Sequence, residues 1–230
     1  MSKRSKNIIA VLVILLPFYL SAIVQKFLFN QNEILIQEFF GYYMMLSVAG
    51  LAVVLLTNRF LLKNNFEVFL TPKRKVIYDL VLAFLLLGSS YFIQSVEQIT
   101  YANWFSFERD RTAITNLLES IFSNYLYALI ILGPFTWFEE AFTVFTVSFI
   151  LYNLWELNST RIWTWTTIFF TASLLALLQV NNGPSAMISS FILISFSNYI
   201  FFKYRSILPL FIAGVLFQTI DLITYWAFTI

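Results

Sequence analysis

The amino-acid sequence predicts an all-α protein, a polytopic membrane bundle of about eight transmembrane helices. Of its 230 residues 60% are hydrophobic and only 11% are charged, whereas soluble domains carry about 25% charged residues. The mean hydropathy is +0.79. Apolar runs also recur at about the 20-residue length that crosses a bilayer. Because about eight such spans would use up the chain, we expect a single transmembrane domain over 1–230.

Three spans are predicted in the N-terminal part of the chain. The first, 7–23, follows the basic stretch 2–6. It begins like a signal peptide but lacks a small-residue cleavage site, so we expect it to be retained. The second and third spans cover 42–56 and 76–93, and the loop between them is basic at 73–75. The positive-inside rule then places the N-terminus and this loop in the cytoplasm.

Residues 97–116 are too polar to cross a membrane, and they mix aromatic with charged side chains. This composition predicts a segment that lies in the headgroup region, with a protein-binding loop as the alternative. Five further spans are then predicted, over 117–132, 137–152, 163–178, 185–202 and 207–230. This count would place Lys203 and Arg205 outside, against the positive-inside rule.

Breaker pairs separate some of these later spans. Gly133-Pro134 is expected to end one helix, and Gly183-Pro184 another, because glycine and proline together interrupt helices.

Four carboxylates fall within the later spans: Glu119, Glu139, Glu140 and Asp221. Each costs about 2.5–3.5 kcal/mol to insert and therefore needs a reason. The adjacent Glu139 and Glu140 are the strongest signal. Since helix neighbours point about 100° apart, one can face the bundle interior while the other caps backbone N–H groups in a first turn. Simple capping at the membrane interface is the alternative for both.

A polar pocket inside the bundle is predicted from five residues, Glu139, Glu140, Gln179, Gln218 and Asp221. Gln218 and Asp221 are three apart and share one helix face, which would point inward because Asp221 is costly against lipid. A structural hydrogen-bonded pair is the alternative for these two residues. Gln179 ends a predicted helix, where an amide at the membrane interface is the alternative.

The sequence contains neither cysteine nor histidine. Disulfides, iron–sulfur clusters and thiolate metal sites are therefore excluded, and so is the commonest general base and transition-metal ligand. We predict no cofactor and no metal site. The net charge is only +2, and the basic residues lie near predicted membrane edges, so we expect no nucleic-acid binding.

The spacing of the polar residues in the C-terminal half also resembles a known family. Glu139-Glu140 follows Gly133-Pro134, and Pro209 opens the last predicted helix. This arrangement is similar to the CAAX-protease and bacteriocin-processing (CPBP) family of intramembrane proteases, also called the Abi family. Its members carry Glu-Glu-x-x-x-Arg, Phe-x-x-x-His and His-x-x-x-Asn/Asp on a bundle of roughly eight helices. The resemblance implies a CPBP-like core over about 116–230.

Most of the reactive residues of that family are replaced in this chain. Val144 stands where the arginine belongs, and Gln179 stands where the second signature has histidine. Gly214 and Gln218 stand at the histidine and the Asn/Asp of the third signature. Because the family is thought to activate water with a glutamate and histidines, the resemblance implies a degenerate member without proteolytic activity, a pseudoprotease.

We expect the first of three functions, and the other two are alternatives. The first is a binding or scaffolding subunit of a membrane protein complex, in contact with membrane lipids and with a protein partner within the membrane. The second is an intramembrane peptidase whose candidate catalytic residues are Glu139 and Glu140. The third is a small transporter or lipid-handling protein. The abundance of Ile, Phe, Asn and Lys indicates an AT-rich, bacterial genome, and hence a bacterial inner (plasma) membrane.

Overall fold

The computed structural model of the chain describes residues 2–29, 36–63, 76–100, 125–157 and 161–229. Within these ranges the chain is almost entirely helical and forms no strand, which confirms the predicted all-α class. The elements are α1 (Lys3–Phe29), α2 (Ile36–Leu56), η1 (Thr57–Leu62), α4 (Val76–Thr100), α6 (Tyr125–Leu157), α7 (Arg161–Ala176), η2 (Leu177–Asn182), α8 (Pro184–Tyr204) and α9 (Leu208–Thr229).

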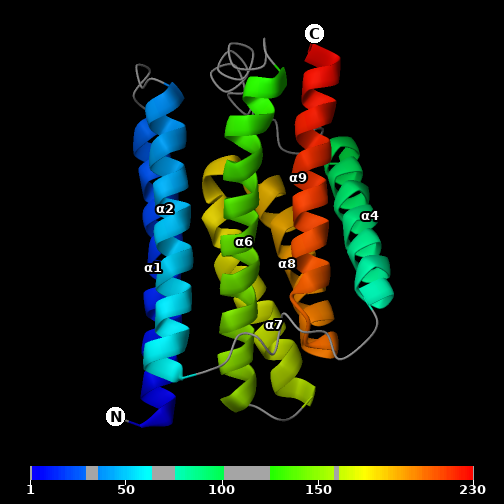
Figure 1. Cartoon of the computed structure of the whole chain (residues 1–230). Coiled ribbons are helices and arrows are strands. Elements are labelled where there is room, and N and C mark those ends of the chain that lie inside the picture. Colours follow the sequence, from blue (N-terminus) through cyan, green and yellow to red (C-terminus); the bar gives the residue numbers. More distant parts are fainter. Residues whose placement is uncertain (1, 30–35, 64–75, 101–124, 158–160, 230) are drawn as a thin grey trace.

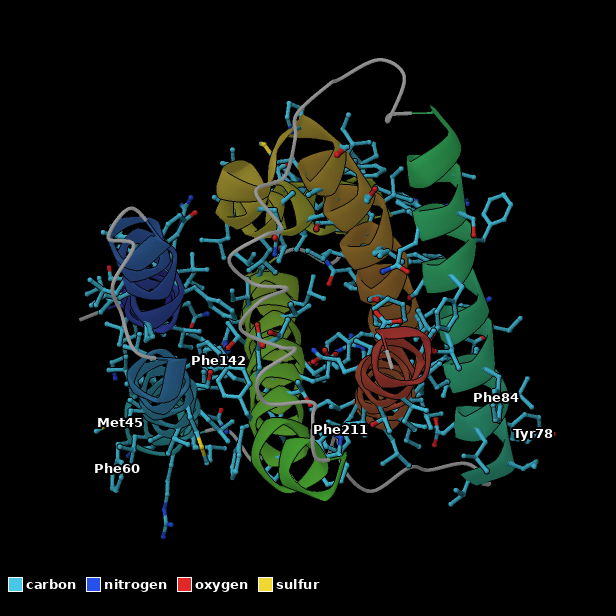
Figure 2. All side chains as sticks on the ribbon, turned by 90° about the horizontal axis from the view of Figure 1, so that it is seen from above. Met45, Phe60, Tyr78, Phe84, Phe142 and Phe211 are labelled. Atoms are coloured by element: carbon cyan, nitrogen blue, oxygen red, sulfur yellow. The ribbon has the colours of Figure 1, made fainter. Side chains whose placement is uncertain are left out.

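α1, α2, α6 and α9 run side by side along the length of the molecule, with the N-terminus at one end and the C-terminus at the other (Figure 1). α6 is central: α2 packs on one side of it and α9 on the other. α1 packs against α2, and α7 pairs with α8. α4 packs against α9 and α8, so that it and the α1–α2 pair form opposite edges of the bundle (Figure 2).

Large apolar side chains cover the outside of the bundle. At one edge Met45 and Phe60 are 73% and 70% exposed, and at the other edge Phe84 is 61% exposed. Figure 2 shows these side chains pointing away from the helices, whereas Phe142 lies between them. A surface of this kind is unfavourable in water and is the expected one against lipid.

Four helices in the described ranges are long and apolar enough to cross a membrane. They are Met44–Leu62, Val76–Val96, Arg161–Gln179 and Pro184–Tyr204. Leu208–Asp221 is a shorter apolar helix of the same bundle. The chain is therefore a helical integral membrane protein, as the composition predicts.

The expected helix break at Gly133-Pro134 is wrong. α6 runs through both residues as one helix of 33 residues, with Pro134 inside it. Next to the proline, the Thr136 hydroxyl donates a hydrogen bond of 2.9 Å to the Gly133 carbonyl oxygen. Hydroxyl groups of this kind help membrane helices to tolerate an internal proline.

The predicted spans 117–132 and 137–152 are consequently one helix over their described part. The described ranges hold seven long helices, so the expected count of about eight is not confirmed. Glu119, and most of the expected interfacial segment 97–116, lie outside the described residues.

The break at Gly183-Pro184 is confirmed. Gly183 has φ 93°, a backbone conformation that side chains other than hydrogen rarely allow. Pro184 follows as the first residue of α8, where its missing N–H costs no helical hydrogen bond. The turn directs α8 back along α7.

Several helix ends that carry basic residues lie at the end of the bundle that holds the N-terminus (Figure 1). The basic residues come from the start of α1, from η1 and its end, from the start of α7 and from the end of α8. The residues are Lys3, Arg4, Lys6, Arg59, Lys63, Arg161, Lys203 and Arg205. Partial burial lowers the pKa of the Arg205 guanidinium, which nevertheless stays protonated at neutral pH. The expectation that Lys203 and Arg205 lie opposite the N-terminus is wrong. Because Gly133-Pro134 does not divide α6, the chain crosses the bundle once less than expected before Lys203. Lys203 and Arg205 therefore lie at the same end as the N-terminus.

A close three-helix contact joins the N-terminal helices to the rest of the bundle. Phe18 of α1 stacks on Phe142 of α6, with ring centroids 4.2 Å apart. Gly50 of α2 is buried directly beside the Phe142 ring, and a Cβ at this position would overlap the ring. The missing side chain at position 50 therefore lets α2 approach α6.

Candidate functional site

A polar contact joins α6 and α9. The carboxyl group of Glu140 on α6 lies against Gly214 on α9. One turn later on α9, Gln218 donates a hydrogen bond from Nε2 to Glu140 Oε2 over 3.5 Å, which is at the long end of the hydrogen-bond range. Gly214 and Gln218 meet the same carboxylate because residues four apart share one helix face.

A second hydrogen bond aligns the same two helices. The indole N–H of Trp137 on α6 donates to the hydroxyl oxygen of Thr219 on α9 over 3.2 Å. The Thr219 hydroxyl in turn donates to the Val215 carbonyl oxygen over 2.7 Å. Together with the Glu140–Gln218 pair, this bond fixes how α9 is rotated against α6. We call Glu140, Gly214 and Gln218, with Trp137 and Thr219, the α6–α9 polar contact.

Asp221 has a different neighbour from Gln218, although the two residues are three apart on α9. The Tyr91 hydroxyl on α4 donates to Asp221 Oδ1 over 3.3 Å. The Tyr91 ring also lies 5.1 Å from the Phe217 ring, measured between centroids. Gln94, on the same helix as Tyr91, also hydrogen-bonds the Asp221 carboxylate. α9 therefore presents Gln218 to α6 and Asp221 to α4.

The remaining residues of the expected pocket are partly buried. Glu139 lies next to Glu140 on α6, and Gln179 lies on η2, whose main neighbours are α1, α7 and α8.

The capping alternative for the glutamate pair is wrong, because α6 begins at Tyr125 and both glutamates lie in its interior.

Val144 stands at the arginine position of the signature that begins with Glu139-Glu140. It is 4% exposed and belongs to the hydrophobic core. A guanidinium there would be surrounded by apolar side chains. The α6–α9 polar contact therefore has no basic group from this position.

The chemistry open to this contact is narrow. Its polar groups are one carboxylate, one amide, an indole N–H and a hydroxyl. In the part of the chain that the structure describes, no three Asp or Glu side chains lie close enough together to hold a metal ion. An amide can donate or accept hydrogen bonds but does not exchange protons near neutral pH. The arrangement is suited to joining helices and to binding polar groups.

Several buried polar residues were not foreseen from the sequence. Asn7, Asn153 and Asn198 are at most 3% exposed, and Asp79 is fully buried. Asn198 reaches across to the next helix, where its Nδ2 donates to the Ile168 carbonyl oxygen over 3.4 Å. Asn7 and Asn198 within the predicted spans 7–23 and 185–202 were an available signal, because an uncharged amide in lipid also needs partners.

Comparison with family models, with curated proteins and with solved structures finds no match to this chain.

Proposed function

We propose that this integral membrane protein is a catalytically inactive binding or scaffolding subunit of a membrane protein complex, and a degenerate relative of the CPBP proteases. The observation that carries the proposal is the Glu140 carboxylate, which lies against Gly214 and accepts a hydrogen bond from Gln218. Both contacts come from α9, so the carboxylate serves to hold two helices together.

The same contact supports kinship with the family. Glu140 belongs to the first signature, while Gly214 and Gln218 occupy the two positions of the third. Residues from both signatures meet between α6 and α9, as they would around a hydrolytic centre. This meeting supports the proposed kinship, in which glycine and glutamine would have replaced the reactive groups.

The residues of this contact are poorly suited to catalysing hydrolysis. A general base must hand its proton on, and a peptidase must also stabilise the oxyanion. Losing a single oxyanion donor already costs about 10²–10³ in rate. Gly214 offers no side chain, Gln218 does not titrate, and Val144 carries no charge, so several contributions are lost together.

We also propose an orientation and a location. The basic end of the bundle faces the cytoplasm, as the positive-inside rule requires, and the C-terminus faces the other side. A bacterial plasma membrane fits both the composition and the basic end of the bundle.

The test compares wild type with Glu140→Gln, which keeps the size and hydrogen bonding of the side chain but removes the carboxylate. Each chain is purified from its native membrane in mild detergent, and proteins present in stoichiometric amounts are identified. We expect a partner that is recovered equally well with both chains. A wild-type chain that runs alone would contradict the scaffold.

Glu140→Gln, together with Glu139→Ala, also separates the scaffold from a peptidase. We expect Glu139→Ala and Glu140→Gln to leave the pattern of processed membrane peptides unchanged. Loss of a processed peptide in either variant, with normal accumulation of the protein, would identify a surviving peptidase and overturn the proposal.

A further inference from the structure

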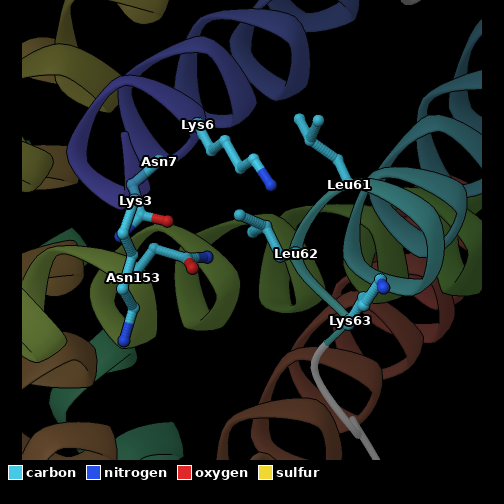
Figure 3. Close-up of a pocket in the computed structure, with 7 residues that line it drawn as sticks. All are labelled: Lys3, Lys6, Asn7, Leu61, Leu62, Lys63 and Asn153. Atoms are coloured by element: carbon cyan, nitrogen blue, oxygen red, sulfur yellow. The ribbon is translucent and has the colours of Figure 1, made fainter. Parts of the chain in front are cut away.

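A hollow of about 350 Å³ opens at the basic end of the bundle, between α1, η1 and α6. Figure 3 shows the side chains that surround it. They are Lys3, Lys6, Asn7, Leu61, Leu62, Lys63 and Asn153. We call this hollow the lysine pocket.

The charge of the lysine pocket has one sign. Three of its seven lining residues, Lys3, Lys6 and Lys63, carry ammonium groups, and none carries a carboxylate. The lysines come from two separate elements, since Lys3 and Lys6 lie on α1 and Lys63 follows η1. Like charges repel one another, so three lysines around one hollow favour a bound anion.

The backbone turns sharply where Lys63 joins this pocket. Lys63 ends η1 in the left-handed conformation, with φ 56°. This conformation is uncommon for a residue with a side chain.

A buried donor points to the same ligand. Asn7 is 3% exposed, and its Nδ2 is buried with no hydrogen-bond partner in the described part of the chain. Buried amide groups in proteins are normally paired, and an unpaired one is unfavourable. Asn7 lines the pocket, and its Nδ2 is enclosed by protein atoms, so turning the amide toward the hollow would give this donor an oxygen of a bound anion as acceptor.

We propose that the lysine pocket binds a phosphate group. Ammonium groups and an amide N–H₂ are donors only, and phosphate oxygens are acceptors. The phosphate comes either from the headgroup of an anionic phospholipid or from a small soluble molecule. Leu61 and Leu62 add an apolar wall, and the strongly exposed Phe60 lies beside them on η1, which favours the lipid. This site does not depend on the proposed scaffold function.

The test measures phosphate binding to the purified protein and to two variants. One variant is Lys6→Gln combined with Lys63→Gln. The matched control is Arg59→Gln, which removes an exposed positive charge from the same η1 helix but lies outside the pocket lining. Native mass spectrometry counts bound phosphatidylglycerol against phosphatidylcholine. Thermal unfolding in detergent measures protection by inorganic phosphate, with chloride holding the ionic strength constant.

We expect phosphatidylglycerol to bind and the lysine variant to weaken it at least about tenfold, because each lost charge-assisted hydrogen bond is worth about that factor. Arg59→Gln should stay within about twofold, as exposed charges contribute little. Protection by inorganic phosphate alone, lost in the lysine variant, would support the soluble source. Binding that falls equally in both variants, or no binding of either probe, would overturn the proposal.

Discussion

Gly214 on α9 lies so close to the carboxyl group of Glu140 on α6 that a Cβ at position 214 would overlap it. The two residues are far apart in the sequence, and neither is unusual alone. Together they let a carboxyl side chain fit between two tightly packed helices. This relationship makes Gly214 the most direct position at which to test the α6–α9 polar contact.

Gly214→Ala should destabilise the protein. The added methyl group would displace the Glu140 carboxyl group and its bond with Gln218, and overpacking of this kind costs about 1–3 kcal/mol. Thermal unfolding in mild detergent measures the effect as a lowered Tm. Combining Gly214→Ala with Glu140→Ala should cost less than the two changes summed, since the overlap disappears.

Gly88→Ala is the matched control, because Gly88 lies on α4 with nothing within 4 Å of a Cβ built there. It should leave Tm unchanged or slightly raised, since alanine favours the helix more than glycine. Equal losses at positions 88 and 214 would show that the Glu140 contact is not the cause.

Gly50→Ala should loosen α2 from α6. Its methyl group would overlap the Phe142 ring, which also stacks on Phe18. We expect the free energy of unfolding to fall by about 1–3 kcal/mol, measured as a lowered Tm. The double variant with Phe142→Leu should recover part of this loss. A double variant no more stable than Gly50→Ala alone would argue against this packing.

Tyr91→Phe should weaken the contact between α4 and α9. It removes the hydroxyl that donates to Asp221 over 3.3 Å, and a typical intramolecular hydrogen bond contributes about 0.5–1.5 kcal/mol. Tyr78→Phe, on the same helix, is the control because Tyr78 is 59% exposed. Thermal unfolding should separate the two variants, and similar Tm values would contradict the role assigned to Tyr91.

The two termini should label from opposite sides of the membrane. The chain contains no cysteine, so Ser5→Cys and Thr229→Cys each introduce a unique thiol. A membrane-impermeant maleimide should reach Ser5→Cys only in inside-out vesicles and Thr229→Cys only in right-side-out vesicles. Labelling of both from one side would require an even number of crossings and contradict the arrangement of α1 to α9.

Sequence patterns predicted the apolar helices well but could not distinguish two similar breaker pairs. Gly183-Pro184 ends a helix and Gly133-Pro134 does not. The difference lies in the backbone, since Gly183 has a positive φ and Gly133 is helical. Neighbouring helices and hydroxyl groups allow membrane helices to keep an internal proline, and that support is not visible in a dipeptide.

The polar contact was only partly predictable for a related reason. The cost of a charge in lipid singled out Glu140 and Asp221 without any structure. Which partner each would meet depends on how the helices are rotated against one another. Gln218 and Asp221 share a face of α9, yet one reaches Glu140 on α6 and the other is reached by Tyr91 on α4.

The lysine pocket could not be predicted from the sequence. Its lysines are visible in the sequence but read there only as signals of orientation. Asn7 and Asn153 lie on α1 and α6, far apart along the chain, and only the fold brings them to one hollow.

The length of α6 has a consequence for the surrounding bilayer. Its 33 residues, at about 1.5 Å of rise each, span about 50 Å, against about 30 Å for the hydrocarbon layer. So long a helix must either tilt strongly from the membrane normal or extend beyond the acyl chains. α2 and α9 are packed on α6, so they tilt together with it. A change in bilayer thickness that alters the tilt of α6 would therefore also alter the tilt of the helices packed on it.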